Sequence, residues 1–525
     1  MNSLDRRTFL KVVGAIPFAV WLKRDAVAAT GPLVRYNVLS TQGQAMLKIY
    51  ADGVSKMKAL FDSDPRSWTF QWYIHAVRDD RTKTTELSRI YPVPGPERTL
   101  ASTVWSTCQA HFNHVNEPFF LPWHRMYVLR FERIIRKLTN QPTFTLPYWN
   151  YSAAGSTHGI LPAAFRTTTS SLFVQNRIAS VNAGKAIDAS SPGALATTAL
   201  SQCSYNPQGS VQGFCQALDS GLHGNVHVLI GDRKNMGSVP WAARDPIFWL
   251  HHCNIDRLWA SWNKGGRSNP TSTTFLNKTF TFADENGQQV VGKVSDVLSI
   301  LRLGYAYSAY EQVPPCMQSS STALAESEPS TAQEELEPSM AQEESAPSMA
   351  QEESAPPMAQ EESTREATRV LTAPAPVPLA SEPVQVQLKM PEAPAAVAPD
   401  TTLDRRIRKL APSTRVYLVI SKLQAAAQPD VLYEVYFAPS EEAREKPPAR
   451  HRVGTINFFN AVSHGEDAQS LVNDERFISF DITHLVRRLQ LEGRLKAEPS
   501  VIIVPAGEPA TDARPVIGSI ELTFQ

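Results

Sequence analysis

Seven histidines fall into two groups along this 525-residue chain, and imidazole is the commonest metal-binding side chain in proteins. The first group lies in the first third of the chain and the second in the middle: His75, His111 and His124, then His223, His227, His251 and His252. Aromatic residues surround both groups in stretches with helical character. Two such groups predict two metal ions rather than one.

The strongest local signal is the pair His223 and His227. A separation of four residues on a helix puts both imidazoles on one face, close enough to bind one ion. A further ligand is expected from the helix that begins at Asp245, an acidic N-cap followed by proline. The adjacent His251 and His252 lie on neighbouring faces of that helix, and its periodicity does not choose between them.

His124 begins a helix whose apolar residues recur every three or four positions, so its side chain is expected to face inward. A lone inward histidine, such as His124 or His75, is more often a core residue than a ligand. Asp256, one turn after His252, is a candidate to hold an imidazole edge through a hydrogen bond. Local spacing therefore supports the second group more strongly than the first.

Three motifs surround these histidines: FFLPWHRMY (Phe119–Tyr127), LHGNVHV (Leu222–Val228) and DPIFWLHHCNIDRLW (Asp245–Trp259). They resemble the signatures of the type 3 copper family, the tyrosinases and catechol oxidases. The resemblance covers about Leu33–Ser308 and includes Arg35 and the string Tyr305-Ala306-Tyr307. It implies a mainly α catalytic domain, a four-helix bundle with a binuclear copper site.

The resemblance also implies which residues bind two copper ions. The first copper would be held by three histidines and the second by three more: His75, His111 and His124, then His223, His227 and His252. The family's double-histidine motif uses its second member, which makes His251 a buried, hydrogen-bonded neighbour. An all-imidazole ligand set suits copper, which can change its oxidation state, whereas zinc cannot.

The middle ligand of the first copper is open between His111 and His114. The commonest family spacing would place it at Val115, so the loop differs in length here. His111 is favoured because Cys108 precedes it, and a cysteine upstream of this ligand is familial. Family members with a cysteine–histidine thioether usually carry a C-x-H string. This chain has C-x-x-H, which argues against a thioether at Cys108.

The implied activity is oxidation of o-diphenols to o-quinones, with O2 and a small phenol as substrates. Tyrosinases that hydroxylate monophenols often carry Asn directly after the first ligand of the second copper, and a Glu upstream of it. Here Gly224 follows His223, and Asp219 is the only acid between Cys203 and His223. Both departures favour diphenol oxidation with at most weak monophenol hydroxylation.

Two other functional classes share parts of this pattern. A haemocyanin-like oxygen carrier would bind O2 without turnover, and bacterial-type export with a single copper domain disfavours it. A binuclear zinc hydrolase is disfavoured because the motifs lack bridging carboxylates. Acidic and basic residues number 51 each, so there is no basic surplus of the kind that attracts nucleic acid.

Composition divides the chain into four parts. Residues 1–29 hold a twin-arginine box, a short apolar run and small residues, typical of a Tat signal, so we expect a periplasmic or secreted protein without a membrane anchor. Residues 30–318 form the aromatic-rich copper domain. Residues 319–400, with nine-residue Pro/Ala/Ser/Glu repeats, predict a disordered linker. Residues 401–525 carry short β-branched runs and predict an antiparallel β-sandwich.

The C-terminal sandwich resembles the trailing domain of polyphenol oxidases, which covers the copper site. The resemblance implies a latent enzyme with an inhibitory lid, activated when a protease cleaves the linker.

Cysteines give one further expectation. Cys203 and Cys215 flank a Gly- and Gln-rich loop and are candidates for a disulfide in an oxidising compartment. Cys253, directly after His252, is expected to be a small buried residue rather than a ligand. Cys316 lies at the edge of the copper domain, and the sequence does not assign its state.

Overall fold

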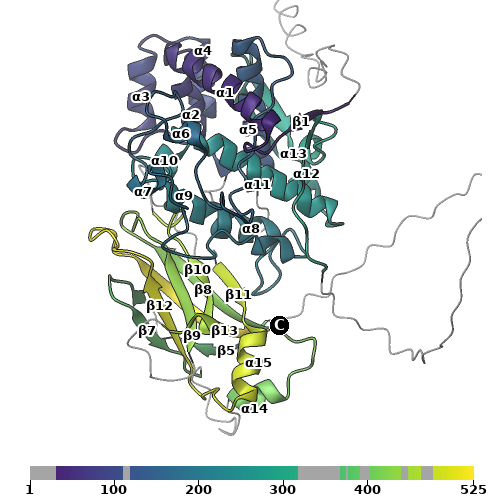
Figure 1. Ribbon diagram of the computed structural model, residues 1–525, viewed down its shortest axis with the longest axis vertical. Helices are drawn as coiled ribbons and strands as arrows, with labels where there is room; N and C mark the ends of the chain where they lie inside the picture. The colour runs from purple at the N-terminus through teal and green to yellow at the C-terminus, as the bar shows by residue number, and fades with distance from the viewer. Residues whose placement is uncertain are drawn as a thin grey trace, which may run out of the picture.

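The computed structural model describes most of the chain, in seven ranges: residues 31–109, 119–316, 367–373, 376–390, 403–438, 447–462 and 477–525. The predicted signal at 1–29 and the competing ligands His111 and His114 fall outside these ranges, as do the linker repeats at 317–366. The described residues form a helical domain and, below it in Figure 1, a domain of two sheets.

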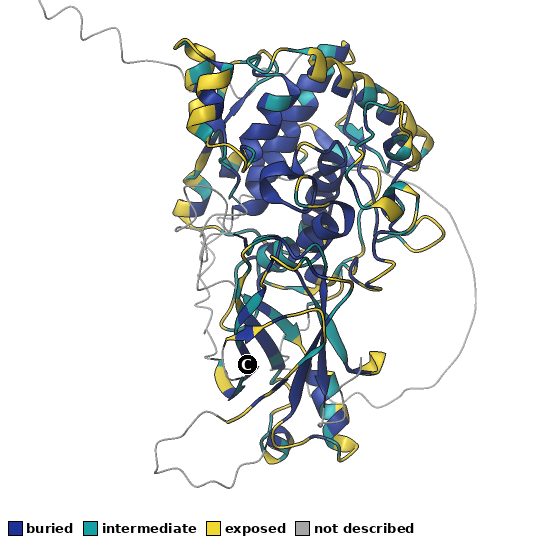
Figure 2. Cartoon of the chain, turned by 90° about the vertical axis from the view of Figure 1, so that its left-hand side faces the viewer, coloured by how far each residue is buried: buried dark blue, intermediate teal, exposed yellow. Residues whose placement is uncertain are grey.

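Helices frame the first domain, and two long ones form its centre. The histidines lie on α2 (Trp68–His75), α5 (Phe120–Thr139), the π-helical turn η3 (Asp219–His223), α9 (Gly224–Ile230) and α11 (Ile247–Lys264). Figure 2 shows the central helices buried, and Phe131 of α5 stacks on Trp249 of α11 with ring centroids 3.5 Å apart. The predicted helical domain, with four helices around the histidines, is confirmed. No described helix is both long and apolar enough to cross a membrane.

Local sequence signals explain where these helices begin and end. The Ser67 hydroxyl caps α2 by accepting the Phe70 N–H at 3.1 Å. At the start of α11, the Asp245 carboxylate accepts the Ile247 N–H at 3.0 Å. α5 ends at Asn140, which adopts the left-handed conformation with φ of 53° that terminates many helices.

A buried charge network closes the helical domain. β1 (Leu33–Arg35) pairs in parallel with β4 (Tyr305–Tyr307). The Arg35 guanidinium donates to Asp256 at 3.1 Å, and the hydroxyls of both β4 tyrosines donate to the same carboxylate at 2.6 Å. Arg125 donates to its other oxygen. The predicted role of Asp256 as an imidazole anchor is therefore wrong, because arginines and tyrosines occupy its carboxylate.

The C-terminal domain consists of two antiparallel sheets with strand orders β10-β9-β12-β7 and β11-β8-β13-β5, with β6 paired to β13. The strands are β5 (Thr368–Thr372), β6 (Val377–Pro378), β7 (Val384–Gln387), β8 (Val416–Gln424), β9 (Tyr433–Ala438), β10 (Arg452–Ile456), β11 (Phe477–Asp481), β12 (Ser500–Pro505) and β13 (Val516–Phe524). Their apolar side chains form one core, so the predicted sandwich is confirmed. Two short helices, α14 (Leu403–Arg408) and α15 (Thr483–Leu491), lie at its lower end in Figure 1.

This sandwich begins earlier than predicted. β5, β6 and β7 lie within residues 319–400, which the composition assigned to the linker. β5 pairs with β13 and β7 with β12, so their partners are distant in sequence. Edge strands of this kind are short and tolerate nearby prolines, so composition alone does not distinguish them from a linker. The predicted boundary at residue 400 is wrong.

The disulfide joins Cys203 to Cys316, whose Cα atoms are 5.6 Å apart. The predicted Cys203–Cys215 bond is wrong, because Cys215 lies on α8 (Phe214–Leu218) with its side chain wholly inside the core. Cys253 is a buried free thiol, and its Sγ contacts the Leu146 carbonyl rather than the histidines.

Candidate metal centre

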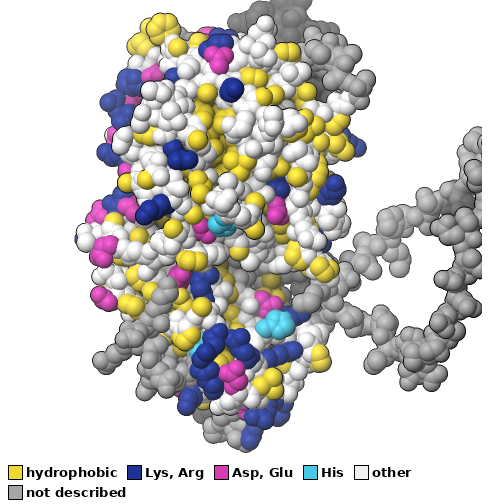
Figure 3. Space-filling model, viewed as in Figure 1, with side chains coloured by type: hydrophobic (Ala, Val, Ile, Leu, Met, Phe, Trp, Pro, Cys, Tyr) yellow, Lys and Arg dark blue, Asp and Glu magenta, His cyan; other side chains and the backbone are white. Residues whose placement is uncertain are grey.

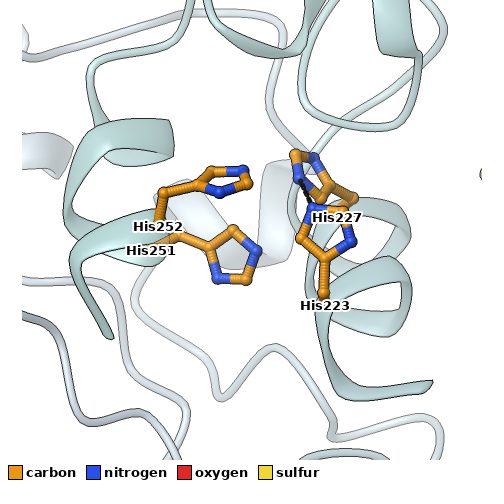
Figure 4. A group of neighbouring side chains, drawn as sticks. All are labelled: His223, His227, His251 and His252. Carbon is orange, nitrogen blue, oxygen red and sulfur yellow. Dashed lines mark hydrogen bonds between the residues drawn. The ribbon is translucent and has the colours of Figure 1, made fainter. Parts of the chain in front are cut away.

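The second histidine group converges in the structure. His223 and His227 reach across from η3 and α9 toward His251 and His252 of α11 (Figure 4). One ring nitrogen from each of the four lies within 4.8 Å of the others, and all four residues are buried. The histidines that the sequence assigned to one metal are therefore brought together, including both members of the adjacent pair.

The ring nitrogens of His223 and His227 are placed so that one metal ion can contact both rings. The Nδ1 of His223 lies 3.2 Å from the Asp219 carbonyl oxygen and 3.0 Å from its carboxylate, and the Nδ1 of His227 lies 2.8 Å from the Met236 carbonyl. Both Nδ1 atoms therefore face oxygen acceptors, and the other nitrogen of each ring, Nε2, is directed into the cluster. The two Nε2 atoms lie 3.1 Å apart. Two nitrogens that bind one ion at about 2 Å each lie about this far apart, so the spacing fits a shared ion.

A distortion in the chain sets the direction of the His223 side chain. The segment Asp219–His223 is a π-helical turn, and within it Gly221 departs from helical geometry with φ of −96° and ψ of −107°. Single π-turns of this kind are rare and occur mostly at functional sites. α9 then continues regularly, which keeps His223 and His227 one turn apart and lets both rings reach the same point.

His251 and His252 both contribute to the cluster, in different ways. The Nδ1 of His251 lies 3.1 Å from the Tyr151 hydroxyl, in agreement with the expected hydrogen-bonded neighbour, yet its Nε2 has no hydrogen-bond partner among the described residues. Neither ring nitrogen of His252 has such a partner. The His252 ring lies 4.3 Å from that of His124 and 5.0 Å from that of His223, between the two groups.

The first group is smaller in the described residues. His75, at the end of α2, and His124, on α5, lie together with Cys108, and their ligand atoms are within 4.8 Å of one another. The Nδ1 atoms of both histidines face carbonyl oxygens, those of Val239 at 3.2 Å and Phe120 at 2.8 Å. The Nε2 of His124 lies 3.6 Å from the Cys108 Sγ, so the ligand atoms of these side chains face one another. The predicted third ligand, His111, its rival His114 and any thioether to Cys108 fall outside the described residues.

Burial keeps these imidazoles neutral, which is the form that binds metals. Desolvation, with repulsion from His223, lowers the pKa of His75 to about 3. Desolvation also lowers the pKa of four others well below the usual value, with neighbouring histidines adding to the effect: His124, His227, His251 and His252. Near neutral pH these five imidazoles are therefore neutral and can bind a metal ion.

Sequence reasoning missed Phe459, which the C-terminal domain inserts beside the second group. Its ring stacks on that of His227, with centroids 4.1 Å apart and planes 12° apart, and it is fully buried. It belongs to the loop after β10. Two consecutive phenylalanines there, flanked by asparagines, were the available signal: Phe458 joins the core of the sandwich and Phe459 the core of the helical domain.

Family models match three parts of the chain. The common central domain of tyrosinase matches residues 65–208 and 187–265, the polyphenol oxidase middle domain matches residues 269–319, and a domain of unknown function matches residues 368–525.

This chain belongs to the type 3 copper protein family. Proteins of this family hold two copper ions, and the two buried histidine groups, with nitrogen donors only in the second, fit that requirement.

The curated relatives include a tyrosinase of Hahella sp. (strain CCB-MM4), 34% identical in an alignment of length 328 that covers 56% of this chain and 66% of the relative. Aureusidin synthase of Antirrhinum majus is 30% identical over 51% of this chain and 50% of its own length. The chloroplastic polyphenol oxidase of Malus domestica is 32% identical over 50% of this chain and 46% of its own length. The chain thus spans about half to two thirds of these relatives.

Solved structures share the fold over nearly the whole chain. Latent apple tyrosinase superposes with a TM-score of 0.55 at 21% identity, covering 95% of this chain and 98% of that one. Latent aurone synthase, a polyphenol oxidase, superposes with a TM-score of 0.56 at 18% identity and covers 95% of this chain. The arrangement of a helical domain followed by a sheet domain is therefore shared.

Proposed function

We propose that this protein is a copper-dependent polyphenol oxidase that converts o-diphenols to o-quinones with O2. The observation that carries the proposal is the pair of Nε2 atoms on His223 and His227, which lie 3.1 Å apart in a buried histidine cluster inside a type 3 copper fold. When bound, two copper ions supply the redox chemistry. Two diphenols together give up four electrons and four protons, which reduce one O2 to two waters.

The chain's own residues prepare the site for this reaction. Backbone carbonyls face the Nδ1 atoms of His75, His124 and His227, so that the Nε2 of each of these rings is directed inward. Aromatic rings exclude water: Phe120 lies 4.7 Å from the rings of both His124 and His223, and Phe248 lies 4.1 Å from His252. A dry site strengthens the electrostatic hold on a bound ion and protects a reactive quinone from side reactions.

We also propose that the C-terminal domain keeps the enzyme latent. A diphenol ring that approaches His227 meets the Phe459 ring already stacked on it at 4.1 Å. The loop that carries Phe459 is fastened at both sides. The Asn457 side chain donates to the Ser220 carbonyl at 2.8 Å and to the Asn225 side chain at 2.9 Å, and Asn460 donates to the Asp219 carboxylate at 3.1 Å.

Gly224 gives the loop room to bind. A Cβ atom at this position would lie 2.5 Å from the Asn457 side-chain oxygen, closer than any packed contact. Glycine, where many monophenol-hydroxylating relatives have asparagine, therefore permits close approach of the C-terminal domain. The substitution fits a packing role as well as a role in substrate choice.

We base the proposed preference for diphenols on the contacts of two polar side chains near the second histidine group, those of Asp219 and Asn225. The Asp219 carboxylate is already bound to the His223 ring and to Asn460. The Asn225 amide donates to the Ala194 carbonyl at 3.0 Å and its oxygen accepts from Asn457. The contact between the Asp219 carboxylate and the His223 ring lies within the helical domain and does not depend on the lid, and the Asn225 amide is not a base. Neither group is therefore available to deprotonate a monophenol in the cleaved enzyme, and oxidation of a diphenol needs no such base at the start.

Export through the twin-arginine route stays part of the proposal. The Cys203–Cys316 disulfide supports it, because such bonds form and persist in oxidising compartments outside the cytoplasm.

The test is to load the full-length protein with copper and compare catechol oxidation before and after cleavage at the linker. We expect a slow rate before cleavage and a fast one after it. Reversible O2 binding without catechol oxidation in the cleaved protein would instead indicate an oxygen carrier, and an unchanged rate would refute latency. His227→Ala serves as the control for metal dependence.

A further inference from the structure

One end of the C-terminal domain is strongly positive. Three segments, residues 403–410, 449–452 and 484–496, contain ten lysines and arginines and only two acidic residues. They comprise α14 and the residues after it, the turn before β10, and α15 with the residues that follow. We call their combined surface the basic face. Figure 3 shows Lys and Arg side chains gathered at this lower end of the molecule.

Contacts in the structure make the basic face continuous. α14 packs against α15. From α15, the Arg487 guanidinium donates to the carbonyl of Thr414 at 3.3 Å, beyond the end of α14, and Arg488 donates to the carbonyl of Arg450 at 2.6 Å. Burial, with repulsion from the nearby Arg494, Arg450 and Arg488, lowers the pKa of His451.

The positive charge of this face is only partly neutralised by the described residues around it. Asp404 pairs with Arg408 at 2.9 Å and Glu492 with Arg494 at 3.1 Å, and Glu434, from outside the face, pairs with Arg452 at 3.4 Å. Arg487 and Arg488 bind carbonyl oxygens, which do not cancel their charge. Ten cations against these three carboxylates give the face a net positive charge, and like charges held together favour a negatively charged partner.

The same chain carries a segment of opposite charge. Residues 317–366 contain twelve glutamates and a single cation, Arg365, with no aspartate or lysine. Most of the glutamates come in pairs that recur every nine residues: Glu334 and Glu335, Glu343 and Glu344, Glu352 and Glu353, Glu361 and Glu362. The chain has 51 acidic and 51 basic residues. Twelve of the acids lie in this segment, and ten of the bases lie in the basic face.

The acidic segment directly precedes β5, whose first residue lies near the basic face. Residue 366 is followed by Ala367 and then by β5, in which Thr368 pairs with Phe524 of β13. The Arg406 guanidinium of α14 lies 5.8 Å from the Phe524 ring centroid. A short tether of this kind gives the attached segment an effective concentration on the order of millimolar at the face, which exceeds that of any untethered polyanion in dilute solution.

We propose that the glutamate repeats of residues 317–366 bind the basic face of the same chain. Each exposed ion pair is weak, about 0.2–1 kcal/mol, but many act at once, and all weaken as salt screens them. Binding holds the repeats against the C-terminal domain and shields them from proteases. The ionic strength around the protein then sets how readily the linker is cut.

The first test is zero-length carbodiimide cross-linking of the full-length protein, read by mass spectrometry. Lys409 and Lys496 are exposed amines on the basic face. We expect amide bonds between these lysines and repeat glutamates at low salt, and their loss at high salt. Lys48 and Lys185, exposed on the helical domain, should give few such links. Equal labelling of all four lysines, or no links to the basic face, would overturn the proposal.

The second test is cleavage of the repeats by a glutamate-specific protease. We expect the rate to rise about tenfold between about 20 mM and about 500 mM NaCl, as the Debye length falls from about 20 Å to about 4 Å. A peptide with the repeat sequence, cleaved in the same tube, corrects for the effect of salt on the protease.

Charge reversal separates the basic face from general electrostatics. The triple variant Lys409→Glu, Arg450→Glu, Lys496→Glu should be cut at the high-salt rate even at low salt. The matched control, with Lys48→Glu, Lys185→Glu and Arg302→Glu, changes the net charge equally at exposed sites of the helical domain and should retain protection. Equal rates in both variants would refute the proposal. So would equal binding of anionic lipid vesicles by intact and linker-cleaved protein, because the face would then be open in the full chain.

Discussion

Phe459→Ala is the sharpest test of how the C-terminal domain blocks the site. The ring is fully buried and stacked on His227 with centroids 4.1 Å apart. Truncating a buried phenylalanine costs about 3–5 kcal/mol in a packed core, and aromatic stacking accounts for about 0.5–1.5 kcal/mol of such contacts. The ring packs with the core of the helical domain, so these contacts are lost when the lid opens.

We assign about half of this truncation cost, about 2 kcal/mol, to contacts that exist only in the closed state. At about 1.4 kcal/mol per factor of ten, it raises the open population about thirtyfold. We therefore expect the uncleaved Phe459→Ala protein to oxidise catechol about thirty times faster than the uncleaved wild type. After removal of the C-terminal domain, the two should have the same rate.

The neighbouring phenylalanine supplies the control. Phe458 points into the sandwich core, where it meets the Tyr433 ring at 5.6 Å. Phe458→Leu should lower the melting temperature of the C-terminal domain and leave the latent rate unchanged. If Phe459→Ala stays as inactive as the wild type before cleavage and equals it afterwards, the ring is not what blocks the site.

Three further predictions follow from single features of the structure. Gly224→Ala should raise the uncleaved rate severalfold and leave the cleaved rate close to wild type, because the added Cβ would meet Asn457 at 2.5 Å; a fully latent variant would contradict this contact. Cys203→Ser should lower the free energy of unfolding by up to about 4.7 kcal/mol, since the bond to Cys316 closes a separation of 113 residues. Non-reducing peptide mapping should find this disulfide in the wild type. The free energy of unfolding of the metal-free protein should fall as the pH falls below about 6.5, by up to about 1.4 kcal/mol per pH unit for each histidine whose pKa is lowered by burial. The reason is that the unfolded chain then binds protons that the folded chain does not, since the pKa of buried His75 is about 3. A denaturation series without this slope would refute the assignment.

The parts of the site that sequence predicted are those that depend on local spacing. His223 and His227 are one helical turn apart wherever the helix is placed, and the double histidine of α11 follows from its motif. The choice between His251 and His252 was not fixed by helical period, because adjacent residues on a wholly buried helix can both face a cluster. The structure places both there for that reason.

What the sequence left out depends on partners distant in the chain. Asp256 lies one turn from a histidine, yet its carboxylate accepts hydrogen bonds from Arg35 and Arg125, which are far away in sequence. Cys316 pairs with Cys203 across a separation of 113 residues. Phe459 belongs to a different domain from the ring it covers. No local pattern carries such information, because each contact exists only in the assembled fold.

The central claim is that the two histidine groups bind copper and oxidise diphenols. The most direct measurement is catechol-dependent O2 uptake by the copper-loaded, lid-cleaved protein, recorded with the metal content of the same sample. We predict about two coppers per chain, one O2 consumed for every two catechols oxidised, and loss of uptake in His227→Ala. A protein that holds two coppers and consumes no O2 with catechol, or that binds no copper, would contradict the account.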